Sequence, residues 1–182
     1  MENDLTLFRR FCTGDETAFD CLVERYRIPL THFINRYVND DSLAEDIAID
    51  AFFRLTIHKH RFRHESSVKT YLFTIGRNRA LDFLRHEYRF GKKELEDLPP
   101  HIVSEGDTTL EHTLSNERSR SVQKAINSLP ADMQAAIQLC YFEELSYAQA
   151  AKIMKKSTKQ LDNLLMRAKK KLRDSLKEEV LP

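Results

Sequence analysis

Two carboxylates, Asp46 and Asp50, stand four residues apart, a spacing that places both on one side of a helix. Paired acids of this kind can perform general acid–base chemistry. The sequence supplies no nucleophile with a neighbouring base and no glycine-rich phosphate loop to accompany them. Carboxylates with this spacing are more commonly a solvated helix face. We therefore expect no catalytic residue, although an enzyme built on this pair remains an alternative.

Three histidines occur within residues 58–64, and histidine is a common zinc ligand. They alternate with lysine and arginine, and no cysteine lies nearby. The chain's three cysteines, Cys12, Cys21 and Cys140, are far apart and odd in number, which indicates reduced thiols. We expect a basic loop here, with no metal site and no cofactor.

Charge is strongly segregated along the 182 residues, although the net charge is only +1. Residues 51–93 and 152–173 are strongly basic, whereas residues 94–117 contain seven acidic residues and no lysine or arginine. This pattern suggests two nucleic-acid contacts separated by a segment that avoids them. No apolar run approaches the twenty residues of a membrane span, and the N-terminus is acidic. We expect a soluble cytoplasmic protein without membrane insertion.

A helix-turn-helix is predicted near the C-terminus. Ser146 precedes Gln149 by three residues, and Ser157 precedes Gln160 by three, so each pair fits a capping box at a helix start. The first helix then covers about 147–154. In the second helix, apolar residues follow one buried stripe: Leu161, Leu164, Leu165, Ala168 and Leu172. A helical hairpin with a solvated lysine-rich face is the alternative.

The remaining chain also has helical periodicity, and few glycines or prolines interrupt it. Long helices are expected over 15–37, 43–55 and 68–90, with a turn over 39–42 and shorter helices over 118–127 and 130–141. The expected buried side of the second helix is Ala44, Ile47, Ala48, Ala51, Phe52 and Leu55. In the third helix, Gly76 is expected to let a neighbouring helix approach closely. In the helix over 130–141, the expected core stripe is Met133, Ile137, Cys140 and Tyr141. Residues 94–117 lose this periodicity around a Pro-Pro pair. We predict an all-α fold of two small helical domains, 1–93 and 118–182, joined by a flexible acidic linker over 94–117.

The helix expected over 68–90 has basic and short polar side chains on its exposed side, with an aromatic residue near its start. These residues are Lys69, Tyr71, Thr74, Arg77, Asn78 and Arg85. Cations along a backbone and a flat ring for stacking suit single-stranded nucleic acid. An amphipathic helix with a solvated face is the alternative.

Three motifs follow one another along the chain. They are Ala44-Glu45-Asp46-Ile47 with Asp50, Phe52, Arg54 and Leu55; residues 70–78 with Ala80-Leu81-Asp82 and Leu84-Arg85; and Leu129-Pro130 with Tyr141-Phe142, Leu145-Ser146-Tyr147 and residues 167–173. In this order they resemble bacterial RNA polymerase sigma factors of the sigma-70 family, in the extracytoplasmic-function (ECF) type. The first resembles the family's polymerase-docking helix, the second its regions 2.3 and 2.4, and the third its region 4.

The resemblance implies a transcription initiation factor that binds core RNA polymerase and promoter DNA, with an anti-sigma factor as a candidate further partner. Polymerase binding would fall to Asp46, Asp50 and Arg54. The −10 element would be read and opened by Lys69, Tyr71, Thr74, Arg77, Asn78 and Arg85. The −35 element would be bound by Thr158, Lys159, Gln160, Asp162, Asn163, Arg167 and Lys170.

The chain departs from the family pattern in the helix-turn-helix. Lys155 and Lys156 replace the usual glycine and apolar residue of the turn, and Asp162 and Leu164 stand where basic residues are common. The family's base code is therefore not transferred to this chain. A dimeric helix-turn-helix regulator is the remaining alternative, but it leaves residues 43–89 unexplained.

Overall fold

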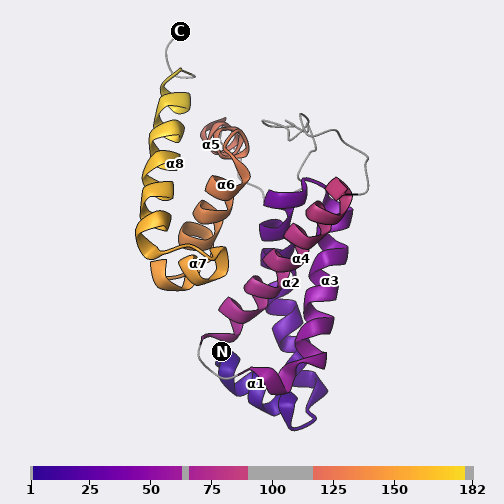
Figure 1. Ribbon diagram of the computed structural model, residues 1–182. Coiled ribbons are helices and arrows are strands. Elements are labelled where there is room, and N and C mark those ends of the chain that lie inside the picture. Colours follow the sequence, from indigo (N-terminus) through magenta and orange to yellow (C-terminus); the bar gives the residue numbers. More distant parts are fainter. Residues whose placement is uncertain (1, 63–65, 90–116, 179–182) are drawn as a thin grey trace.

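The computed structural model describes residues 2–62, 66–89 and 117–178, and these residues form helices without a strand. The expected all-α architecture is confirmed. Figure 1 shows two lobes side by side. The N-terminal lobe contains α1 (Asp4–Cys12), α2 (Glu16–Val38), α3 (Asp41–Ile57), the 3₁₀ turn η1 (Lys59–Arg61) and α4 (Val68–Arg89). The C-terminal lobe contains α5 (Glu117–Asn127), α6 (Ala131–Ile137), the π-helical turn η2 (Gln138–Phe142), α7 (Tyr147–Met154) and α8 (Thr158–Glu178).

Short polar side chains set the ends of the N-terminal helices. Asp15 caps α2 by accepting the Thr17 backbone N–H at 3.1 Å. Hydrogen bonds from the Thr17 hydroxyl and from Arg10 lower the pKa of Asp15 to about 2. Asn39 ends α2 in the left-handed conformation, and Asp40 then caps α3 through the Leu43 N–H at 2.9 Å. The start of α2 and the turn after it agree with the sequence prediction, whereas α1 was not predicted.

The core of the N-terminal lobe forms where α2, α3 and α4 meet. The buried side of α3 is the predicted one: Ala44, Ile47, Ala48, Ala51, Phe52 and Leu55. Gly76 of α4 faces α2 so closely that a Cβ there would lie 2.9 Å from Leu30 Cδ1 and 3.2 Å from Ile34 Cδ1. The close approach expected at this glycine is therefore present. This close packing fixes the position of α4, and of its exposed side chains, relative to α2.

Both predicted capping boxes are formed in the C-terminal lobe. Ser146 N donates to Gln149 Oε1 at 3.0 Å, and Ser157 N donates to Gln160 Oε1 at 2.8 Å. Between the two helices, Lys155 adopts the left-handed conformation with φ 52°. A lysine thus occupies the turn position whose left-handed backbone conformation usually favours glycine.

The predicted stripe of α8 faces the lobe's core, with Leu161, Leu165 and Ala168 buried and the other two residues packed against them. Lys156, at the end of the turn, pairs with Asp132 of α6 at 3.0 Å. The apolar side chain usual at this position is thus replaced by an ion pair within the lobe.

The π-helical turn η2 changes the direction of the side chains that follow α6. Glu143 N donates to Gln138 O at 2.9 Å, one residue further back than in an α-helix. The expectation that Tyr141 belongs to the core stripe is wrong, since this side chain is exposed. The wider turn breaks the 3.6-residue periodicity on which that expectation rested.

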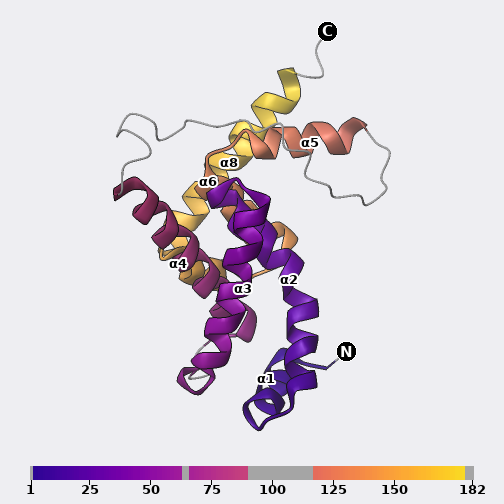
Figure 2. The same cartoon turned by 90° about the vertical axis from the view of Figure 1, so that its right-hand side faces the viewer.

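The two lobes are in contact, and α4 packs against α7 while α2 packs against α6. The view in Figure 2 also places α6 and α8 behind the bundle of α2, α3 and α4. The predicted linker over 94–117 lies outside the described residues except for its last position. Within the described ranges, no helix is both long and apolar enough to cross a lipid bilayer.

Candidate nucleic-acid interface

The outward side of α8 is the most basic exposed helix face in the C-terminal lobe. All seven residues predicted to contact the −35 element are exposed there: Thr158, Lys159, Gln160, Asp162, Asn163, Arg167 and Lys170. Gln160 is already engaged in the capping box. The other six are available on a helix held rigidly from behind by its buried stripe. This is the geometry in which a second helix enters a DNA groove.

Asp162 is the one acid among these seven residues, and a cation accompanies it. Lys169 lies about two turns further along α8, with its Nζ 5.1 Å from the ring centre of Tyr141. Hydrogen bonding to Tyr141 raises the pKa of Lys169, and the charge of Asp162 contributes in the same direction. Lys169 therefore adds a positive charge to the same helix that carries Asp162.

The residues predicted to read the −10 element occupy different environments along α4. Arg85 is exposed and pairs with Asp82 at 3.0 Å. Lys69, Tyr71, Thr74 and Asn78 are half-buried. The Thr74 hydroxyl donates to Thr70 O at 2.7 Å, within the same helix. Only the C-terminal end of this set is therefore open to solvent in this conformation.

Arg77 differs from its prediction as an exposed residue, because only 8% of it is accessible. Its guanidinium lies over the ring of Tyr37, 5.8 Å from the ring centre, and its Nε donates to the Tyr37 hydroxyl at 3.3 Å. Burial raises the pKa of Tyr37 to about 12, although Arg77 acts in the opposite direction. A pattern on α4 alone could not reveal this burial, because part of it comes from the other lobe.

Tyr71 packs beside a second aromatic residue. Its ring centre lies 5.2 Å from that of Phe62, which is buried at the end of the basic loop after α3. Tyr71 is itself only partly buried and packs against the core. One face of this ring is thus supported from within, an arrangement that suits a base-stacking platform.

On α3 the two predicted acidic contacts are not equivalent. Asp46 is exposed. Asp50 Oδ2 receives Arg54 Nε at 2.9 Å and Arg79 Nε of α4 at 2.5 Å, so it joins the two helices. Burial opposes ionisation of Asp50, but the hydrogen bonds from both arginines outweigh it and lower its pKa. Arg54 is therefore held by Asp50 rather than free.

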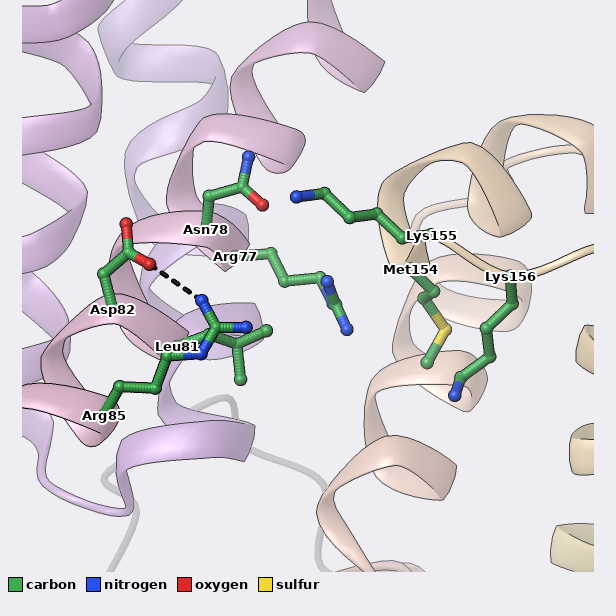
Figure 3. A pocket seen from close by; sticks show the side chains of 8 residues that line it. All are labelled: Arg77, Asn78, Leu81, Asp82, Arg85, Met154, Lys155 and Lys156. Carbon is green, nitrogen blue, oxygen red and sulfur yellow. Dashed lines mark hydrogen bonds and ion pairs between the residues drawn. The ribbon is translucent and has the colours of Figure 1, made fainter. Parts of the chain in front are cut away.

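A groove of about 460 Å³ lies between the lobes, and half of its eight lining residues are cationic: Arg77, Arg85, Lys155 and Lys156. Asp82, which pairs with Arg85, is its one acidic residue. Figure 3 shows Arg77, Asn78 and Arg85 of α4 on one side and Lys155 and Lys156 on the other, with Lys155 extending toward Asn78. Arg77 and Asn78 thus face the turn of the helix-turn-helix. Within the described ranges, no group of three or more His, Cys, Asp or Glu side chains is arranged to hold a metal ion.

Comparison with known proteins explains why these two surfaces share one chain. Residues 22–90 match the family Sigma-70 region 2, and residues 119–172 match Sigma-70, region 4. The chain is 32% identical over 160 residues to RNA polymerase sigma-H factor of Pseudomonas aeruginosa, covering 84% of this chain and 83% of that protein.

The chain belongs to the sigma-70 family. It is also 33% identical over 158 residues to the ECF RNA polymerase sigma-E factor of Haemophilus influenzae, covering 83% of each protein. The fold is similar to that of the sigma factor RpoE from Bartonella quintana, solved in complex with the anti-sigma factor NepR. That comparison has a TM-score of 0.64 and 25% identity, and covers 87% of this chain and 96% of RpoE.

As an ECF sigma factor, the protein is a transcription initiation factor that directs core RNA polymerase to promoter DNA, and it is not an enzyme. The N-terminal lobe corresponds to region 2 and the C-terminal lobe to region 4. The paired acids of α3 therefore have no catalytic role, and the alternative of a dimeric operator-binding regulator is set aside.

Sequence reasoning missed an apolar stripe on α3 of this sigma factor. Ile49, Phe53 and Ile57 follow one another at intervals of four residues and are 57%, 61% and 57% exposed. Exposed large apolar side chains that share a helix face mark an interaction surface. The signal was present in the sequence as a second apolar period on the helix, opposite the buried residues of the core.

A second missed residue is Met166, exposed on the outward side of α8. It lies one turn after Asn163 and one turn before Lys170. An apolar side chain among polar ones on a recognition helix can contact the methyl group of thymine. The sequence signal that could have identified Met166 is an apolar residue that lies outside the buried stripe of the helix.

Proposed function

We propose that region 2 of this sigma factor docks on core polymerase through the outer side of α3 and opens the −10 element through α4. Region 4 then binds the −35 element through α8. The domain division that supports these roles is 1–93, 94–117 and 118–182. The observation that carries the proposal is the exposed basic side of α8, held by two capping boxes and a buried leucine stripe.

On α3, the docking surface combines Asp46 with the stripe of Ile49, Phe53 and Ile57, supported by the Asp50–Arg54 pair. Apolar anchors surrounded by charges are typical of the centre and rim of a protein interface. Asp50 and Arg54 contribute mainly by fixing the geometry of this side of the helix, because they are bound to each other.

On α4, Tyr71 supplies a stacking surface, and Lys69, Thr74, Arg77, Asn78 and Arg85 supply donors for the melted strand. Extracting bases from a duplex costs a few kcal/mol, which stacking and hydrogen bonds must offset. On α8, Asn163 is the leading candidate for a base edge, because an asparagine amide can form two hydrogen bonds with adenine.

The factor acts in the cytoplasm, where polymerase and promoters are found. An anti-sigma factor is a further proposed partner, since the similar RpoE of B. quintana was solved with one.

The test is run-off transcription with core polymerase, the full-length protein and a library of promoter fragments. We expect transcripts from a small set of sequences that share elements near −10 and −35. Replacing Ile49 and Phe53 together with serine should abolish transcription and binding to core polymerase, while the free protein keeps its helical circular dichroism. Wild-type binding to core by this variant would refute the docking surface. Transcription without any shared promoter element would refute the assignment of α4 and α8.

A further inference from the structure

A shielded ion pair between the two lobes involves a residue assigned to promoter opening. Lys69 Nζ of α4 lies 2.8 Å from Glu143 Oε2 and donates to the Glu143 backbone oxygen at 2.9 Å. The same ammonium lies 5.7 Å and 5.8 Å from the ring centres of Tyr26 and Phe73. The side chains of Lys69 and Glu143 are only 19% and 8% exposed, so the pair is well shielded from water and salt.

The C-terminal lobe holds Glu143 in position for this contact. Gln138 Nε2 donates to Glu143 Oε1 at 3.1 Å, which leaves the other carboxylate oxygen facing Lys69. The Glu143 N–H bonds to Gln138 O through the π-helical turn. The acceptor is therefore preorganised within region 4 before the lobes meet.

A second polar attachment joins α2 to the C-terminal lobe. Arg36 Nη1 donates to Asn127 Oδ1 at 3.0 Å and to Gln134 Oε1 at 3.3 Å. Burial lowers the pKa of Arg36, and its buried Nε has no hydrogen-bond partner among the described residues. Buried apolar residues of both lobes also belong to one hydrophobic cluster, so these polar contacts supplement apolar packing. A buried donor left unsatisfied weakens the interface and favours a reversible association.

The cationic groove beside this interface also favours reversibility. Lys155 of the turn faces Asn78 and Arg77 of α4, so positive charges from the two lobes are brought together (Figure 3). Like charges at close range oppose association. The attraction between Lys69 and Glu143 therefore opposes the repulsion between Lys155 and Arg77, which lies about two turns further along α4 than Lys69.

We propose that this arrangement is a self-blocked state of the free sigma factor, in which region 4 covers the −10-reading side of region 2. The proposal rests on the function proposed above for Lys69 and Arg77. While Glu143 accepts from Lys69 and Arg77 is buried, neither cation can contact single-stranded DNA. The outward side of α8 remains exposed in the same state. Closure therefore blocks strand capture by region 2 but leaves region 4 able to bind duplex DNA.

The test compares Glu143→Lys with Glu144→Lys in the full-length protein. Both substitutions change the net charge equally, so a general gain in DNA affinity from added positive charge is common to both. Glu144 is exposed at the neighbouring position with φ 52°, a conformation that Lys155 already adopts with φ 52°. Lysine is therefore tolerated there. Glu143→Gln is a milder second variant that removes the charge and keeps the shape.

Closure is measured directly by the distance between spin labels at the exposed positions Ser42 of α3 and Lys171 of α8, attached through non-canonical amino acids. We expect one narrow distance distribution for the parent and for Glu144→Lys, and a broad, longer one for Glu143→Lys. The charge-swapped double variant Lys69→Glu/Glu143→Lys should restore the narrow distribution. A broad distribution already in the parent would overturn the closed state.

Blocking is measured by fluorescence anisotropy with a labelled single-stranded oligonucleotide of mixed sequence and with a duplex of the same length. If the closed form outnumbers the open form ten to one, Glu143→Lys should bind the single strand about tenfold more tightly than Glu144→Lys. The two variants should bind the duplex equally. An opened Glu143→Lys with no advantage on the single strand would overturn the block.

A separate measurement distinguishes failure of the block from failure of the proposed function. Holoenzyme reconstituted with Lys69→Ala should open promoters poorly, because the lysine is then missing from the bound strand. Normal opening by this holoenzyme would refute the role of Lys69 itself. The distances between the lobes would still report whether the free factor is closed.

Discussion

Asp50→Asn and Asp46→Asn are a matched pair of substitutions, one helical turn apart on α3, that separate a structural acid from a docking acid. Asp50 receives two charged hydrogen bonds, at 2.9 Å from Arg54 and at 2.5 Å from Arg79. Its side chain is 34% exposed. Hydrogen bonds to charged groups contribute about 1.5–3 kcal/mol each when buried, whereas exposed ion pairs contribute about 0–1 kcal/mol.

Because about a third of the Asp50 carboxylate is in water, we expect Asp50→Asn to reduce the free energy of unfolding by about 1–2 kcal/mol in total. Asp46 is exposed and forms no ion pair within the described ranges. Asp46→Asn should therefore change the stability by about 0.5 kcal/mol or less. It should nevertheless weaken binding to core polymerase.

The stability difference also has a predicted dependence on pH. The pKa of Asp50 in the folded protein lies below its ordinary value of 3.8. The contribution of Asp50 is therefore fully present above that ordinary value and is lost as the pH falls through the folded-state pKa. Urea denaturation followed by circular dichroism, at pH 7 and at pH 3, measures both effects. Equal unfolding midpoints for the two variants at pH 7 would refute the reasoning. A difference between their midpoints that is larger at pH 3 than at pH 7 would also refute it.

Three further predictions concern the interface and its supports. Asn163→Ala should relax preference at one promoter position by about 1–3 kcal/mol, whereas Lys170→Ala should weaken all sequences alike and reduce the salt slope by about one; a promoter library selected at two salt concentrations measures both, and indistinguishable profiles would contradict the major-groove arrangement. Gly76→Ala should destabilise the protein by about 1–3 kcal/mol in thermal denaturation, because its Cβ would meet Leu30 at 2.9 Å, and a stabilised variant would show that α2 yields easily. Lys155→Gly should stabilise the protein by up to about 1 kcal/mol by relieving the left-handed conformation, and a lower melting temperature would mean that the lysine side chain makes a contribution of its own.

The sequence predicted best those features that depend on local chemistry. The buried side of α3 was predicted in full because six small or apolar residues repeat with the helical period and nothing interrupts them. The two capping boxes were predicted because a Ser and a Gln three residues apart satisfy each other's backbone groups without help from the rest of the fold.

The errors arose where distant residues decide the outcome. Arg77 was expected in solvent, yet Tyr37 of α2 and the neighbouring lobe bury it. Tyr141 was expected in the core, but a π-helical turn rotates it outward, and a 3.6-residue period cannot reveal such a turn. In the same way, a role for Glu143 cannot be inferred from its own neighbours in the sequence, because its partner Lys69 is 74 residues away.

The π-helical turn also makes the contact between the lobes sensitive to chain length. Each residue of an α-helix advances the side-chain direction by about 100°, so one residue more or fewer re-aims everything that follows. Deleting a single residue within Gln138–Phe142 would restore a regular α-helix and present a different side chain to Lys69. The outward side of α8 would keep its composition. A one-codon insertion or deletion in this turn would thus alter the contact between the two lobes during evolution, without any change in the residues that face DNA.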